Sequence, residues 1–106
     1  PSPRDNPVRY HLLIAYDVAD PKRLRLVHRT VRGYGDAVQY SVYLGILSEK
    51  DEAVLREKLA DIIHHREDQV IFIRLGSEDS GAPTMPDHWR VLGRRITLPE
   101  RRFHVF

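Results

Sequence analysis

The chain has 106 residues, 17 basic and 15 acidic side chains and no cysteine, with a net charge of +2. This length fits one domain with a two-layer core. The lack of cysteine excludes a disulfide framework and a thiolate metal site, and it fits the reducing cytoplasm, where we expect the protein. No stretch approaches the ~20 apolar residues of a membrane span and no signal-peptide pattern occurs, so we expect no membrane partner.

The kind of positive charge says more than the small net value. Arginine outnumbers lysine fourteen to three. The planar guanidinium grips phosphate with two hydrogen bonds, whereas a lysine acts as a point charge. A GC-rich genome also favours arginine codons, so the positions of the arginines decide more than their number.

The first predicted element is a strand. Residues 1–9 are rich in proline and predict a flexible arm, and Tyr10–Val18 is then almost continuously apolar, as in a strand at the centre of a sheet. This run closes on Tyr16 and Asp17. A carboxylate at the end of a buried strand needs solvent, a partner charge or a metal ion. The alternative is that Asp17 only caps the following loop.

A helix is expected next. Asp20 is suited to the N-cap and Pro21 to the first helical position, and Gly33 and Gly35 supply the end. One face repeats an apolar residue every three or four positions, at Leu24, Val27, Val31 and Tyr34.

The other face of this helix carries a basic stripe, formed by Lys22, Arg25, Arg29 and Arg32. No acidic residue lies between Lys22 and Gly35. A charged stripe is often only a solvated face. Unrelieved repulsion between like charges nevertheless favours an anionic partner, and nucleic acid is the partner that we expect.

Ala37–Leu47 alternates between two sets of side chains, which predicts either one long strand or two strands joined near Tyr40 and Ser41. Ser48–Asp51 resembles a capping box that opens a second helix. The apolar face of this helix consists of Leu55, Leu59, Ile62 and Ile63. Gln69–Leu75 predicts another buried strand.

The remaining chain predicts a loop over 76–87 and a C-terminal strand and tail over 88–106. The order of elements then favours a single α+β domain over 1–106, with its core at 10–75. We predict a ferredoxin-like βαββαβ fold with an antiparallel sheet and an additional C-terminal strand. Because both helices cover one sheet face, an apolar bare face predicts a homodimer that packs sheet to sheet.

The candidate chemistry rests on acidic residues. The six histidines form no metal motif and no glycine-rich phosphate loop is present, which leaves Asp17 with Asp20 as the hydrolytic candidate. One carboxylate per chain is too little for Mg²⁺, which prefers six oxygen ligands. Two copies of Asp17 related by a two-fold axis, with water and substrate phosphate, would complete such a site.

Four sequence motifs resemble those of a known family. They are Tyr-Asp-Val-Ala-Asp at 16–20, the arginine-rich helix ending in Tyr34-Gly35, Val-Gln-Tyr-Ser-Val-Tyr at 38–43, and Asp-Gln-Val at 68–70. Over Tyr10–Leu75 the chain resembles the CRISPR-associated endonuclease family two (Cas-two), the small partner of the spacer-acquisition integrase. Two positions depart from the pattern. Ala37 stands where a basic residue is usual, which weakens the case for strong nuclease activity, and Tyr43 stands where phenylalanine is usual.

The resemblance implies a ferredoxin-like homodimer in which Asp17 of each chain binds a shared Mg²⁺ or Mn²⁺ and is catalytic. It implies hydrolysis of single-stranded RNA or double-stranded DNA during spacer acquisition. In other members the same dimer is a non-catalytic scaffold that bridges the integrase and DNA. Arg23 and Arg25 match basic positions that are functional in family members, so we expect Arg23 to bind nucleic acid together with the stripe residues. The residues expected to support the site are Asp20, Tyr16, Ser41 and Tyr43.

A third hypothesis sets the resemblance aside and takes the domain as an RNA-binding module. Such a module would use aromatic side chains on its central strands to stack bases. Tyr16 and Tyr43 are the candidates for this role.

Overall fold

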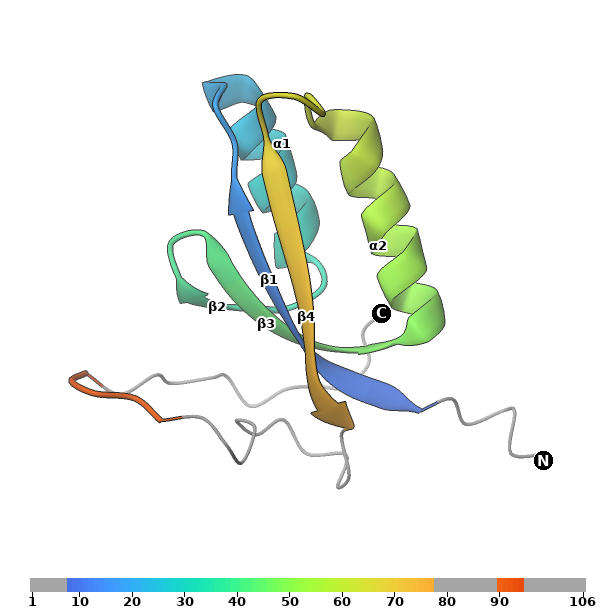
Figure 1. The fold of residues 1–106 in the computed structure, drawn as a ribbon, viewed down its shortest axis with the longest axis vertical. Coiled ribbons are helices and arrows are strands. Elements are labelled where there is room, and N and C mark those ends of the chain that lie inside the picture. Colours follow the sequence, from blue (N-terminus) through green and yellow to red (C-terminus); the bar gives the residue numbers. More distant parts are fainter. Residues whose placement is uncertain (1–7, 78–89, 95–106) are drawn as a thin grey trace.

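The computed structural model of the chain describes residues 8–77 and 90–94. The elements follow in the order β1 (Arg9–Asp17), α1 (Pro21–Arg32), β2 (Asp36–Gln39), β3 (Val42–Ser48), α2 (Glu49–Ile62) and β4 (Gln69–Ser77). This is the predicted βαββαβ order, so the ferredoxin-like α+β prediction is confirmed for the described part of the chain (Figure 1).

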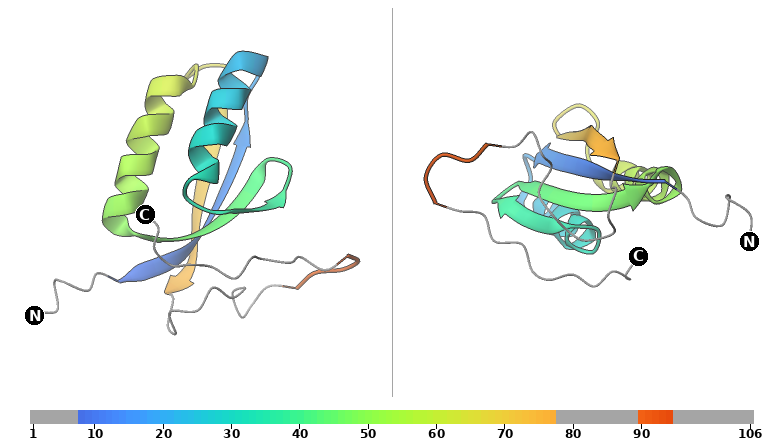
Figure 2. Two further views of the ribbon diagram at one scale, coloured as in Figure 1. Left: turned by 180° about the vertical axis from the view of Figure 1, so that it is seen from behind. Right: turned by 90° about the horizontal axis from the view of Figure 1, so that it is seen from below.

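The four strands form one antiparallel sheet in the order β2-β3-β1-β4. Both helices lie side by side on the same face of this sheet, and the left view of Figure 2 shows them in front of it. The described elements therefore leave the other face of the sheet without a covering helix. No helix in this part of the chain is long and apolar enough to cross a membrane.

The core lies between the helices and the sheet. Side chains along a strand alternate between its two faces. Leu12, Ile14 and Tyr16 of β1 are therefore buried beneath the helices, whereas Leu13 and Ala15 lie on the bare face. The other buried members of the core are Val18, Val27, Val31, Tyr43, Leu47, Leu55 and Leu59.

Both helices begin where the sequence predicts. The Asp20 side chain accepts hydrogen bonds from the backbone amides of Lys22 and Arg23, at 3.0 Å each. Ser48 accepts one from the amide of Asp51 at 3.1 Å. Each bond satisfies an amide that the first helical turn leaves without a partner.

The region Ala37–Leu47 forms two strands, β2 and β3, which meet at Tyr40 and Ser41. Of the two alternatives that the sequence left open, the structure therefore selects the hairpin. Ser41 also ties this turn to the central strand, because its carbonyl accepts a hydrogen bond from the Tyr16 amide at 3.1 Å.

The predicted core boundaries of 10 and 75 are too narrow. Arg9, assigned to the arm, pairs with Ser48 of β3, and β4 continues through Gly76 to Ser77, which pairs with Tyr10 across a register shift. Gly76, the first residue of the predicted loop, belongs to β4 instead. Its φ of +122° is a conformation that glycine adopts readily, so the strand can continue through it. Of the predicted C-terminal strand, the structure describes only 90–94, which lie in no helix or strand; the rest of 88–106 is outside the described residues.

Candidate nucleic-acid and metal site

Asp17 is the last residue of β1, and its side chain is exposed. It shares its face of the strand with Ala15 and Leu13, two and four positions before it, and this is the face without helices. Its backbone pairs with Gln69 of the neighbouring strand β4. The structure thus places the predicted catalytic carboxylate at the rim of the bare sheet face, where the chain turns into α1.

A second carboxylate, Asp68, fixes the loop that follows Asp17. Its oxygens accept hydrogen bonds from the amides of Ala19 and His64, at 2.9 and 2.8 Å, and from Nε of Arg23 at 2.8 Å. The side chain has no exposed surface. The Arg23 guanidinium, followed by these two amides, holds the pKa of Asp68 far below its usual range. Asp68 therefore stays ionised and joins the β1–α1 connection to the α2–β4 connection.

This network sets Arg23 apart from the other basic residues of α1. Its guanidinium also pairs with Glu67 at 3.2 Å, and only 24% of its side chain is exposed. The hydrogen bond to Asp68 is the main reason that the pKa of Arg23 is raised. Arg23 thus anchors the start of the helix, and its predicted contact with nucleic acid stays a prediction.

Tyr16 and Tyr43 point into the core rather than toward solvent. Their hydroxyl groups lie 3.0 and 3.2 Å from Nδ1 of His28 on α1, and their rings stack with centroids 6.3 Å apart. Burial, with a smaller contribution from Tyr43, raises the pKa of Tyr16 to about 12, and burial also raises the pKa of Tyr43. Both phenols are therefore protonated at neutral pH. Because neither ring is exposed, these tyrosines do not offer the base-stacking surface that an RNA-binding module would need.

The basic stripe is exposed as predicted: Lys22, Arg25, Arg29 and Arg32 all face solvent. In the described part of the chain, the ion pairs engage Arg23, Arg56 and Arg74 and none of the stripe residues. A pocket of about 280 Å³ opens along this stripe, lined by Leu24, Arg25, His28, Arg29, Arg32 and Tyr40. The stripe is thus positive charge that forms no ion pair with a described residue, which suits a polyanion.

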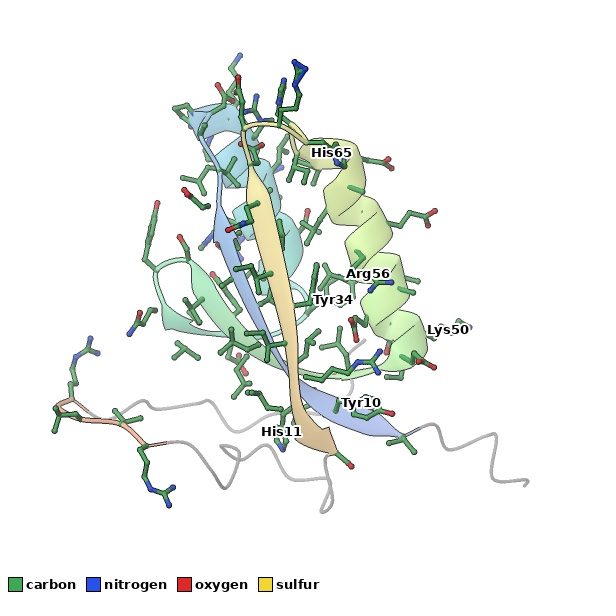
Figure 3. All side chains as sticks on the ribbon, in the orientation of Figure 1. Tyr10, His11, Tyr34, Lys50, Arg56 and His65 are labelled. Carbon is green, nitrogen blue, oxygen red and sulfur yellow. The ribbon has the colours of Figure 1, made fainter. Side chains whose placement is uncertain are left out.

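A metal ion would find few ligands within one copy of the chain. Residues 8–77 and 90–94 contain no group of three or more side chains suited to hold one. Figure 3 shows His11 and His65 at opposite ends of the molecule, so these two histidines cannot share an ion. Among the three aspartates near the start of α1, Asp20 uses one oxygen to cap the helix, and both oxygens of Asp68 accept hydrogen bonds. Asp17 is therefore the one of these three whose carboxylate is available to a metal ion. Mg²⁺ is often held by one or two carboxylates with water and substrate phosphates, so the donor set fits once a second copy supplies its own Asp17.

Sequence reasoning missed Asp68 and His28 as parts of this region. In the sequence, Asp68 is noted only as part of the Asp-Gln-Val motif, and His28 is noted only as one of six histidines without a metal motif. The bonds of Asp68 to Ala19 and Arg23 span 49 and 45 residues, and that between Tyr16 and His28 spans 12. The one available signal was a charged residue directly before an apolar run that predicts a strand, a position where it needs a partner. The prediction that this strand is buried is wrong, because β4 lies at the edge of the sheet and none of its residues is buried.

The chain matches a known family over most of the described fold. The family model described as CRISPR associated protein Cas2 matches residues 10–82. A protein of Rhodospirillum rubrum named CRISPR-associated endoribonuclease Cas2 1 is 39% identical over 64 residues, which are 60% of this chain and 63% of that protein. The match thus spans less than two thirds of that relative. CRISPR-associated endoribonuclease Cas2 of Thermus thermophilus is 31% identical over 76% of this chain and 81% of its own length.

Solved structures agree with this match. The Streptococcus pyogenes Cas2 structure at pH 6.5 aligns with a TM-score of 0.56 and 31% identity, over 59% of this chain and 82% of that chain. The crystal structure of a hypothetical protein from Thermus thermophilus aligns with a TM-score of 0.65 and 25% identity, over 87% of this chain and 99% of that one.

Proposed function

Since the chain belongs to the CRISPR-associated Cas2 family, we propose that it is a divalent-metal-dependent endonuclease that acts in spacer acquisition together with the integrase. Its substrate is single-stranded RNA or double-stranded DNA, and RNA agrees with the endoribonuclease names of the relatives. The observation that carries the proposal is Asp17, an exposed carboxylate at the rim of the bare sheet face and at the start of the helix with the basic stripe.

The proposal requires two copies of the chain, and the bare face supports this. Cross-strand pairing places Ile73 beside Leu13 and Ile71 beside Ala15, so these four side chains lie on one face. Ile71 and Ile73 are 42% and 45% exposed, although both are large and apolar. An exposed apolar patch of this kind marks an interaction surface. A second copy packed on it about a two-fold axis would direct two Asp17 side chains toward the same rim.

In this homodimer the two Asp17 carboxylates would hold one Mg²⁺ or Mn²⁺ beside the phosphodiester. The ion, when bound, supplies positive charge that polarises the phosphate and favours deprotonation of the attacking water. The arginines of the basic stripe hold the backbone of the strand through charge-assisted hydrogen bonds. Asp68 and Arg23 keep the loop after Asp17 in place, and they would thereby orient its carboxylate.

The test is a metal-titrated cleavage assay of the parent protein and its Asp17→Asn variant on single-stranded RNA and on duplex DNA. We expect cleavage by the parent that requires the divalent ion, and no cleavage by the variant, which keeps the shape of the side chain and loses its charge. Equal cleavage by both proteins would contradict the role of Asp17. If neither cleaves with any ion while both bind DNA and the integrase equally, the function is that of a non-catalytic scaffold.

A further inference from the structure

The pocket on α1 is lined on one side by an aromatic residue, Tyr40, which phosphate binding does not require. Tyr40 lies at the turn between β2 and β3, and 77% of it is exposed. It lines the same pocket as Arg25, Arg29 and Arg32. Burial therefore does not explain a large aromatic ring at this position, because little of its surface leaves water when the chain folds.

The two kinds of side chain in this pocket suit the two parts of a nucleotide. Arginines at successive turns of a helix, with no ion pair to a described residue, bind phosphate oxygens. An exposed aromatic ring stacks on the face of a base, and Leu24 adds an apolar surface beside it. Inside a duplex the faces of the bases already stack on their neighbours, so such a ring can reach only an unpaired base.

We propose that this pocket binds an unpaired nucleotide of a nucleic-acid strand, with its base stacked on Tyr40 and its phosphates held by Arg25, Arg29 and Arg32. The inference rests on the proposed function only in taking nucleic acid as the ligand, and it needs neither cleavage nor a metal ion. It gives the protein a preference for single strands or frayed ends that the basic stripe alone would not create, since phosphate groups are present in single strands and in duplexes alike.

The test measures the affinity of the full chain, without divalent ion, for a labelled single strand of about ten nucleotides and for a duplex whose ends are closed by hairpins. Tyr40→Ala should weaken single-strand binding roughly 5- to 150-fold, which is the range for loss of one stacked base. Duplex binding should change less than about twofold, because it uses the backbone. Tyr40→Phe keeps the ring and should behave like the parent protein.

A strand with abasic sites completes a double-mutant cycle. The parent should bind it as weakly as Tyr40→Ala binds the normal strand, and Tyr40→Ala should lose nothing further on it. Arg29→Ala should weaken both single strand and duplex and reduce the salt slope by about 0.7 to 0.9 for one lost phosphate contact. Arg56→Ala, an exposed arginine of α2, is the matched control and should bind like the parent.

Three results would overturn the inference. In the first, Tyr40→Ala binds the single strand as tightly as the parent, while Arg29→Ala binds it more weakly. The pocket would then bind only the phosphate backbone, and the proposed function would stand. Full displacement of the strand by a nucleoside monophosphate, at equal nucleotide concentration, would assign the pocket to free nucleotides. Failure of the parent to bind any nucleic acid would remove the proposed function as well.

Discussion

Asp17 differs from the other carboxylates at its end of the molecule in what its oxygens contact. Asp20 and Asp68 accept backbone hydrogen bonds that hold a helix start and a loop, and Glu67 pairs with Arg23. The carboxylate of Asp17 is exposed, and it accepts no hydrogen bond from a described residue. A residue that the fold does not use is free for binding, and its substitution should affect activity rather than stability.

The first prediction separates these two kinds of carboxylate. Asp20→Ala should lower the free energy of unfolding by about 1 kcal/mol, the usual cost of a lost N-cap, and should retain metal-dependent cleavage. Asp17→Asn should lose cleavage without any fall in stability, because removing like charges does not weaken a dimer. Urea denaturation and cleavage rates measure both effects. An Asp20→Ala variant that is stable but inactive would place Asp20 in the site.

The second prediction concerns pH and Asp68. Its folded pKa lies below the value of about 3.9 for an unfolded aspartate. The ionised form therefore stabilises the fold fully above that pH, and the stabilisation is lost as the pH falls below about 4 toward the folded pKa. Thermal melts at decreasing pH should show a steeper loss for the parent than for Asp68→Asn, which should be less stable at neutral pH. Asp61→Asn on α2 is the control, and an equal slope in all three proteins would contradict the prediction.

Local contacts were predictable from the sequence and distant ones were not. Asp20 lies two and three residues from the amides that it caps, so the local sequence, an aspartate directly before Pro21, is enough to predict its role as N-cap. The partner of Arg23 lies 45 residues away, at a distance that only the folded sheet closes. The sequence therefore predicts a nucleic-acid contact for Arg23, as it does for the residues of the basic stripe, whereas the fold pairs Arg23 with Asp68.

At the scale of the elements, α1 was predicted in full because its two faces follow one helical period. The hairpin was not, because one long strand and two antiparallel strands keep the same alternation. Neither glycine nor proline marks the turn at Tyr40 and Ser41. The alternation also leaves open which set of side chains faces the helices, and the structure places Tyr43 and Leu47 there.

The third prediction uses the glycine that lets β3 approach the helix layer. A Cβ at Gly45 would collide with the carbonyl oxygen of Tyr34 and would lie 2.6 Å from Cδ1 of Leu47. Gly45→Ala should therefore lower the free energy of unfolding by roughly 1–3 kcal/mol through overpacking. Gly33→Ala is the matched control, because its Cβ would lie 3.5 Å from the Thr30 carbonyl, an ordinary contact. It should be neutral or stabilise by about 0.4–1 kcal/mol.

At the scale of the whole molecule, we expect the two faces of the sheet to have different functions, nucleic-acid binding on the helix side and dimerisation on the bare side. The helix layer carries the basic stripe and the Tyr40 pocket, whereas the bare face carries exposed Ile71 and Ile73. A homodimer through the bare face would leave both basic stripes accessible. Asp17 lies at the rim between these surfaces, so a strand bound along α1 would reach the paired carboxylates at the end of the sheet.

The fourth prediction tests this arrangement with a charge in the bare face. Ile73→Asp should give a monomer in light scattering at micromolar concentration, because a buried unpaired carboxylate strongly disfavours an apolar interface. It should keep its fold, since Ile73 is already 45% exposed. Val54→Asp, at a 39% exposed position of α2, should remain dimeric and active. A monomeric parent protein would contradict both the dimer and the shared ion.

The last prediction asks whether one active dimer needs both copies of Asp17. When parent and Asp17→Asn chains are mixed in equal amounts and allowed to exchange, about a quarter of the dimers should carry two parent chains. If the ion needs both carboxylates, cleavage should fall to about a quarter of that of the same total amount of parent protein. If each chain acts alone, cleavage should fall only to about half. A mixture with Ile73→Asp chains controls for exchange, because these should not enter the dimer and should leave the rate per parent chain unchanged.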